Sequence, residues 1–303
     1  MRRAISFSEP VPPRSPSAGR SLFGAFAARL LPALLLTLLA CSWGDGAPSG
    51  SARWVSLAPS MTEILFAVGA GREVAGVCEP ADRPPEAASL PRVASWERLD
   101  VEAVVALAPS ACFTVSGMQT PSALASLERF GIPVHAYPME SLEDVFSAVE
   151  SVGARTGRAA EGLGLAESYR ARVRAAGRGI PPGPPERALA VVGLNPLVVA
   201  GGPSFLTGVL RAAGFENALE GRGEGYPAVS LEDAAAAAPD AVVFPEGEMS
   251  AGSVRLFLER LEEASGRPAR AVPVPADLLV RPGPGSVEAV ERLARERGAG
   301  GTP

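Results

Sequence analysis

The sequence predicts an α/β fold: two Rossmann-like lobes, each with a central and mostly parallel sheet, joined by one long interlobe helix. Three observations support this prediction. Strand and helix patterns alternate along most of the chain, as parallel sheets require. A long segment rich in helix-forming residues lies between two such series. A motif that begins at Asp100 is repeated at Ser230, one copy in each series.

The first series is predicted from apolar strand patterns and from the residues that start and stop helices. Ser60 and Glu63 have the spacing of a capping box, Asp100 and Ser141 precede helical patterns, and Gly131 ends one. The expected elements, in order, are strand 54–57, helix 60–69, strand 74–77, helix 100–107, strand 111–115, helix 120–130, strand 133–136 and helix 141–153.

The long helix is expected over 158–177, at about 30 Å for twenty residues. Such a single helical connection predicts limited hinge motion between the lobes. Prolines between Pro181 and Pro185 exclude regular structure. The second series is then strand 188–192, helices 205–213 and 231–238, strand 241–244, helix 253–265, strand 271–274 and helix 286–297.

The repeat pairs 100–111 with 230–241: a capping residue, an apolar residue, a glutamate, an alanine-rich helix, Ala-Pro and the next strand. Two explanations of its glutamates, Glu102 and Glu232, stay open. An acidic residue in the first helical turn is stabilised by the helix dipole. Alternatively, two equivalent carboxylates on one face could pair with arginines of a symmetric membrane partner.

The N-terminal segment is typical of an export signal. It is arginine-rich, and its apolar run over 30–40 is short for a membrane span. The run ends in Leu-Leu-Ala-Cys, which resembles the lipobox of bacterial lipoproteins. We therefore expect a signal peptide over 1–40, a lipid anchor on Cys41 and a tether over 41–52. An ordinary secretory signal cut elsewhere is the alternative. Ser42 favours the outer membrane where a cell has one, and the choice of membrane stays open.

Composition argues against several functional classes. One His and three Cys make a zinc or manganese site unexpected, and a net charge of −5 without a basic stripe argues against nucleic-acid binding. No nucleophile elbow, P-loop or zinc-protease motif is found, so we do not expect an enzyme. Export would permit a disulfide between Cys78 and Cys112, but the sequence favours two buried free thiols.

Several motifs carry a resemblance to a known family. They are Val-Ser-Leu-Ala-Pro-Ser over 55–60 with Thr62-Glu63 and Gly69-Ala-Gly71, Asp-Arg-Pro-Pro-Glu over 82–86, Leu-Pro-Arg-Val over 90–93, and the segment 127–134. The chain resembles class III periplasmic solute-binding proteins of ABC importers, over 53–297, and the cobalamin (vitamin B12)-binding proteins most closely. Siderophore and haem binders share that fold, which is the helical-backbone metal receptor type. We expect an N-terminal lobe over 53–155, an interlobe helix over 156–180, a C-terminal lobe over 181–297 and a tail over 298–303.

The resemblance also implies roles for individual residues. In that family the ligand lies between the lobes, and a glutamate on each lobe docks on permease arginines; Glu102 and Glu232 match these glutamates. Trp96, Asp277 and Arg281 match ligand-contacting positions of the cobalamin binders, and Asn195 lies in a matching Gly-x-Asn-Pro turn. We add Tyr226 as a candidate wall residue.

These assignments have plainer alternatives. Trp96 could cover a sheet edge, Tyr226 could simply pack, and Asp277 could pair with Arg281 four residues later. The match also has gaps, because aromatic positions of the cobalamin binders are occupied here by Pro80, Val115 and Leu278. Fewer aromatic faces leave less area for stacking.

The expected function is that of a monomeric solute-binding lipoprotein of an ABC importer. It would capture cobalamin or a related corrinoid in an interlobe cleft and deliver it to a permease dimer with its ATPases. A ferric siderophore or haem is the alternative ligand, and a non-transport lipoprotein that serves as a sensor or scaffold is the alternative class. We expect no cofactor and no resident metal.

Overall fold

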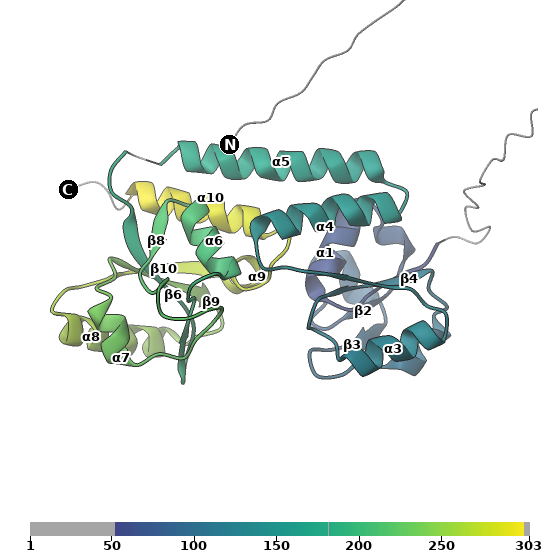
Figure 1. Cartoon of the computed structure of the whole chain (residues 1–303), viewed down its shortest axis with the longest axis horizontal. Helices are drawn as coiled ribbons and strands as arrows, with labels where there is room; N and C mark the ends of the chain where they lie inside the picture. Colours follow the sequence, from purple (N-terminus) through teal and green to yellow (C-terminus); the bar gives the residue numbers. More distant parts are fainter. Residues whose placement is uncertain (1–51, 181, 300–303) are drawn as a thin grey trace, which may run out of the picture. The chain divides into compact units, whose positions relative to one another are not determined.

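The computed structural model describes residues 52–180 and 182–299. The expected signal peptide, Cys41, nearly all of the tether and most of the tail lie outside these residues. Within them the chain forms two lobes with one sheet each, connected in sequence by the long helix α5 (Ala159–Arg178) (Figure 1). The predicted fold class is confirmed.

The N-terminal lobe contains a five-stranded parallel sheet in the order β3-β2-β1-β4-β5. Its strands are β1 (Trp54–Ser56), β2 (Val74–Cys78), β3 (Arg92–Ala94), β4 (Ala111–Val115) and β5 (Val134–Tyr137). Its helices are α1 (Pro59–Ala67), α2 (Val101–Ala106), α3 (Pro121–Arg129) and α4 (Leu142–Arg155), with short 3₁₀ turns η1 (Gly71–Glu73) and η2 (Pro85–Ser89).

Alternation along the strands gives this sheet two buried faces. On β4, Cys112 packs with Val55 and Leu127 on one side, whereas Phe113 packs with Trp54 on the other. Successive side chains of a strand point to opposite faces, so near-continuous apolar runs are what a sheet covered on both sides requires.

The C-terminal lobe has a sheet in the order β10-β9-β6-β7, with β8 paired in parallel to the start of β6 and β7 antiparallel to its end. The strands are β6 (Glu186–Leu194), β7 (Leu197–Val199), β8 (Phe215–Asn217), β9 (Ala241–Glu246) and β10 (Arg270–Pro275). The helices are α6 (Phe205–Ala212), α7 (Leu231–Ala236), α8 (Ala251–Ser265), α9 (Ala276–Leu279) and α10 (Ser286–Ala299).

Helices α4 and α10 each lie along α5 (Figure 1). Glycines bring α4 and α5 together: a Cβ on Gly162 would lie 2.9 Å from the Val149 carbonyl oxygen and 3.0 Å from the Cα of Gly153. On the other side of α5, Arg172 donates to Glu291 of α10 at 2.8 Å. The connector is therefore packed along its length against both lobes. None of the described helices has a stretch long and apolar enough to span a membrane.

Apart from small differences at the ends of elements, the sequence-based elements differ from the structure in two main respects. The predicted capping box is wrong, because α1 begins at Pro59 and its N-cap, Ala58, makes no side-chain cap. Proline is favoured at the first helical position, since its φ is already set, and this places Ser60 and Glu63 inside the helix. The short elements β3, β7, β8 and α9 were not predicted. Cys78 and Cys112 are buried free thiols, as the sequence favoured.

The repeated motif forms the same structure twice. Helices α2 and α7 each span six residues and carry a side-chain N-cap, from Asp100 to the Ala103 N–H and from Ser230 to the Asp233 N–H. Each copy then turns through an alanine with φ 46°, Ala108 and Ala238, immediately before the proline. Two non-glycine residues share this uncommon left-handed backbone at equivalent positions. The two copies are therefore repeated in three dimensions as well as in sequence.

Candidate functional site

The carboxyl ends of parallel strands are where α/β sheets bind ligands, because the loops that follow the strands meet there. Three candidate residues lie in such loops or beside them and are exposed. Trp96 follows β3 and is 75% exposed, Tyr226 is 46% exposed, and Asn195 is exposed in the tight turn between β6 and β7. The Trp96 indole is therefore largely open to solvent, whereas Tyr226 is partly packed, and burial raises the pKa of its hydroxyl.

Asp277 and Arg281 do not pair with each other, so that alternative is wrong. Asp277 accepts a hydrogen bond from Arg83, which lies in the loop after β2. Arg281 donates to Glu63 at 3.2 Å and to Asp82 at 3.0 Å. We call these five residues the interlobe charge cluster, because every pair in it joins one lobe to the other.

The cluster lies at a close approach of the two lobes. A Cβ on Gly283 would lie 3.7 Å from the Cβ of Ser60 and 3.8 Å from an Oε of Glu63. The Glu63 side chain is 9% exposed and the Arg281 side chain 16%, whereas that of Asp82 is 56% exposed. The Glu63–Arg281 pair is therefore buried at the junction, and Asp82 joins it from the solvent side.

Burial and pairing compete in setting the charges of this cluster. Burial raises the pKa of the Glu63 carboxyl, even though its hydrogen bond to Arg281 acts in the opposite direction. Partial burial also acts to raise the pKa of Asp82, but its hydrogen bond to Arg281 and the positive charges of Arg281 and Arg83 together lower it. Both arginines stay charged: hydrogen bonding to Asp277 raises the pKa of Arg83, and that of Arg281 is raised against the effect of burial.

The sequence did not identify Glu63, Asp82 and Arg83 as site residues. The capping-box pattern gives Glu63 a local role in a helix cap, and Asp82 and Arg83 belong only to a family-like motif. That motif was the available signal, because it places adjacent opposite charges in the loop that follows a buried strand.

The other candidates are not joined to this cluster. Among the described residues, no hydrogen bond or ion pair connects Trp96, Asn195 or Tyr226 to it. The described residues also contain no group of three His, Cys, Asp or Glu side chains placed to hold a metal ion.

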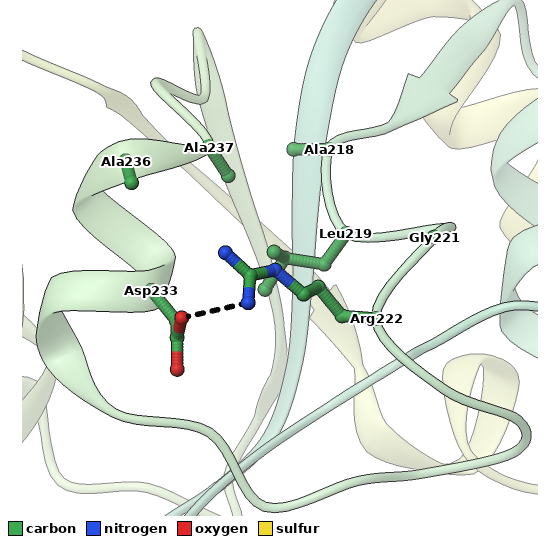
Figure 2. A pocket seen from close by; sticks show the side chains of 7 residues that line it. All are labelled: Ala218, Leu219, Gly221, Arg222, Asp233, Ala236 and Ala237. Atoms are coloured by element: carbon green, nitrogen blue, oxygen red, sulfur yellow. Dashed lines mark ion pairs between the residues drawn. The ribbon is translucent and has the colours of Figure 1, made fainter.

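A hollow of about 240 Å³ lies in the C-terminal lobe between α7 and the loop after β8 (Figure 2). Arg222 extends across it to Asp233 of α7 at 3.1 Å. Figure 2 shows the guanidinium occupying the space between the loop and the helix. A second hollow of about 280 Å³ lies near α6 and β8 in the same lobe. Neither hollow is lined by Trp96, Tyr226 or the interlobe charge cluster.

Glu102 and Glu232 occupy the second position of α2 and α7. Both are exposed, and no ion pair or side-chain hydrogen bond to another described residue is made by either of them. Their neighbours in the repeat do have partners: Asp100 and Ser230 cap the helices. Two equivalent carboxylates are thus free to meet an external cation.

Comparison with known proteins places these features in a family. The family model described as "Periplasmic binding protein" matches residues 55–271. A vitamin B12-binding protein of Vibrio vulnificus is 28% identical over 242 residues, covering 80% of this chain and 88% of the relative.

Solved structures agree on the fold. A periplasmic haem-binding protein of Roseiflexus has a TM-score of 0.71 at 28% identity, covering 82% of this chain and 99% of that one. The vitamin B12-binding protein of Vibrio cholerae has a TM-score of 0.69 at 23% identity, covering 81% and 96%.

Family membership has two consequences. A member of this family is a substrate-binding protein and not an enzyme, as the sequence predicted, and it is exported to the periplasm. The chain belongs to the periplasmic binding protein family, in the group whose relatives are named for binding vitamin B12 and haem.

Proposed function

We propose that this chain is the solute-binding lipoprotein of an ABC importer and that it captures cobalamin or a related corrinoid between its lobes. The similarity to the Vibrio vulnificus vitamin B12-binding protein, which extends over 80% of the chain, carries the proposal. The exposed ring of Trp96 and the half-exposed ring of Tyr226 support it, since aromatic faces suit the broad apolar surface of a macrocycle.

Calorimetric titration with cobalamin, haem and a panel of ferric siderophores tests the ligand. We expect a saturable 1:1 interaction with cobalamin. The Trp96→Ala variant should bind it about five- to tenfold more weakly through loss of stacking. Phe130→Ala is the matched control, because Phe130 is 64% exposed but lies at the amino end of β5, on the opposite edge of the sheet. Tight binding of a siderophore without binding of cobalamin would reject the corrinoid.

Haem is the second candidate ligand. The fold and 28% identity shared with the Roseiflexus haem-binding protein favour it. The same titration separates the two, since the leading proposal requires cobalamin to bind more tightly than haem.

We further propose that Glu102 and Glu232 dock the loaded protein on its permease. The repeat supports this role, because it gives each lobe one exposed glutamate without a partner among the described residues. Reversing both to Arg should lower corrinoid uptake at least tenfold while leaving binding in solution unchanged. Reversal of two other exposed helical glutamates, Glu128 of α3 and Glu263 of α8, is the control. Unchanged uptake in the first variant would reject docking and favour a sensor or scaffold.

The lipid anchor is proposed from the lipobox-like segment that ends at Cys41. Metabolic labelling with a fatty-acid analogue should mark the wild-type protein, and the Cys41→Ala variant should stay unlabelled. Fractionation of the labelled membranes then assigns the anchor to the inner or the outer membrane. Absence of label in the wild type would indicate an ordinary secretory signal.

A further inference from the structure

The loops at the carboxyl ends of the strands contain arginines that are all engaged by carboxylates. They are Arg83 with Asp277, Arg98 with Asp100 at 3.5 Å, Arg222 with Asp233 at 3.1 Å, and Arg281 with Glu63 and Asp82. In the sequence, Arg98 lies two residues from Trp96, and Arg222 lies four residues from Tyr226. Each of these arginines therefore already has a carboxylate partner. The Arg98–Asp100 pair is largely exposed and weak, whereas the Arg281–Glu63 pair is buried.

The same loops carry additional carboxylates that make no ion pair with any described residue. They are Glu79 after β2, Glu97 after β3, Glu140 after β5, Glu224 before Tyr226, Glu246 at the end of β9, and Glu248. All are exposed. Glu97 directly follows Trp96, so the exposed indole has an unpaired negative charge as its neighbour.

The interlobe charge cluster does not supply an excess of positive charge to offset these carboxylates. Its two arginines face three carboxylates, Glu63, Asp82 and Asp277. An anionic ligand arriving at this edge would therefore meet unpaired negative charge, and it could gain a cation only by displacing an existing ion pair. Carboxylates are recognised most strongly by unengaged guanidinium groups, which can donate two hydrogen bonds in parallel.

We infer that the carboxyl edges of the two sheets select a neutral or cationic metal chelate and discriminate against chelates that carry free carboxylates. This inference rests on the proposed function in one respect, namely that the ligand is a metal chelate bound at this edge. A corrin fringed with amides fits the requirement, whereas a porphyrin with two ionised propionates does not.

Two pairs of probes test this charge rule with the ring system held constant. The first is cyanocobalamin and its monocarboxylic acid, in which one side-chain amide is hydrolysed. The second is haem and haem dimethyl ester. Calorimetry at low salt should show the acid binding about five- to tenfold more weakly than the parent corrinoid, because a unit charge a few ångströms from a like charge costs this much even in water. The ratio should shrink as salt is added.

Variants assign the effect to named residues. Asp277→Asn removes the carboxylate that pairs with Arg83. It should therefore reduce, by several-fold, the ratio between the affinities for cyanocobalamin and for its monocarboxylic acid. Glu97→Gln should do so without risk to the fold, because Glu97 is exposed and makes no ion pair with a described residue. Glu259→Gln, on the exposed face of α8, is the control and should leave the ratio unchanged.

The outcomes separate this inference from the proposed function. Equal or tighter binding of the acid overturns the charge rule while the corrinoid assignment stands. If neither corrinoid binds, the corrinoid proposal is rejected, and the haem pair then tests the charge rule. Tighter binding of haem dimethyl ester than of haem supports the charge rule, and tighter binding of haem overturns it. If no probe binds, both are overturned.

Discussion

Replacing Arg281 with Met is the sharpest test of the interlobe charge cluster. The change removes both ion pairs of Arg281 and keeps most of its apolar stem. Asp82 loses little, since its side chain is 56% exposed and water replaces its partner. Glu63 is different, because its side chain is 9% exposed and, among the described residues, Arg281 is its ion-pair partner. Most of the cost of the change therefore comes from Glu63.

The size of this cost has an upper limit. A buried carboxylate without a partner can take up a proton, and at pH 7 this costs about 3.7 kcal/mol for a carboxyl with an ordinary pKa of about 4.3. Burial has already raised the pKa of Glu63, which lowers that cost. We expect the variant to lose about 2–3 kcal/mol of unfolding free energy, or roughly 4–12 °C in melting temperature. Arg255→Met is the control, because the Arg255–Glu259 pair is 79% and 60% exposed, and it should cost under about 0.5 kcal/mol.

The pH dependence of the stability loss identifies Glu63 as its source. Loss of Arg281 raises the folded-state pKa of Glu63 further above its unfolded value. The penalty is therefore present at pH 7 and disappears as the pH falls below the ordinary carboxyl range, where Glu63 is protonated in both states. The other groups that face Glu63, namely Arg83, Asp277 and Tyr169, are unchanged in the comparison.

Urea unfolding at pH 7 and at pH 4 measures the effect, and adding Glu63→Gln should restore most of the lost stability at pH 7. The reasoning is refuted if the Arg281 variant is as stable as the control, or if Glu63→Gln restores nothing.

Three further predictions concern the scaffold. Cys78 and Cys112 should resist iodoacetamide at pH 8 until urea unfolds the protein, as read by peptide mass spectrometry, because burial raises both pKa values to about 12. Gly162→Ala should lower the unfolding free energy by about 1–3 kcal/mol, since its Cβ would lie 2.9 Å from a carbonyl oxygen of α4, whereas Gly164→Ala, with nothing within 4 Å, should raise it by about 0.5–1 kcal/mol. Ala238→Gly should stabilise the protein by about 1 kcal/mol in the same assay, because φ at this alanine is 46° and glycine adopts that backbone without strain.

The sequence predicted most elements because their signals are local. Asp100 and Ser141 cap α2 and α4 as expected, and the pattern over 111–115 became β4 with the same bounds. A capping residue acts on an N–H only two or three positions away, so its effect can be inferred without knowing the fold. Three-residue strands such as β3 and β8 carry no comparable signal, since their pairing with a neighbouring strand decides them.

The interlobe charge cluster could not be predicted either, because its contacts also join residues that are distant in the sequence. Glu63 and Arg281 are 218 positions apart in sequence, and nothing near either residue indicates the other. Local reasoning instead gave each residue a local role: Glu63 in a helix cap, and Arg281 paired with Asp277. Both assignments were chemically sensible, and packing of the lobes overrode them.

The repeat explains why the two kinds of functional residue differ in how well they can be predicted. Each proposed docking glutamate lies on a six-residue helix set by its own cap at one end and by an alanine with φ 46° before proline at the other. Everything that orients Glu102 or Glu232 on its helix is thus contained in about a dozen consecutive residues, and two copies of that unit repeat the orientation within each lobe. A ligand bound between the lobes, as proposed, would depend on contacts that arise only after the lobes have packed. A change in ligand can therefore alter the loops at the carboxyl edges while both docking units stay intact.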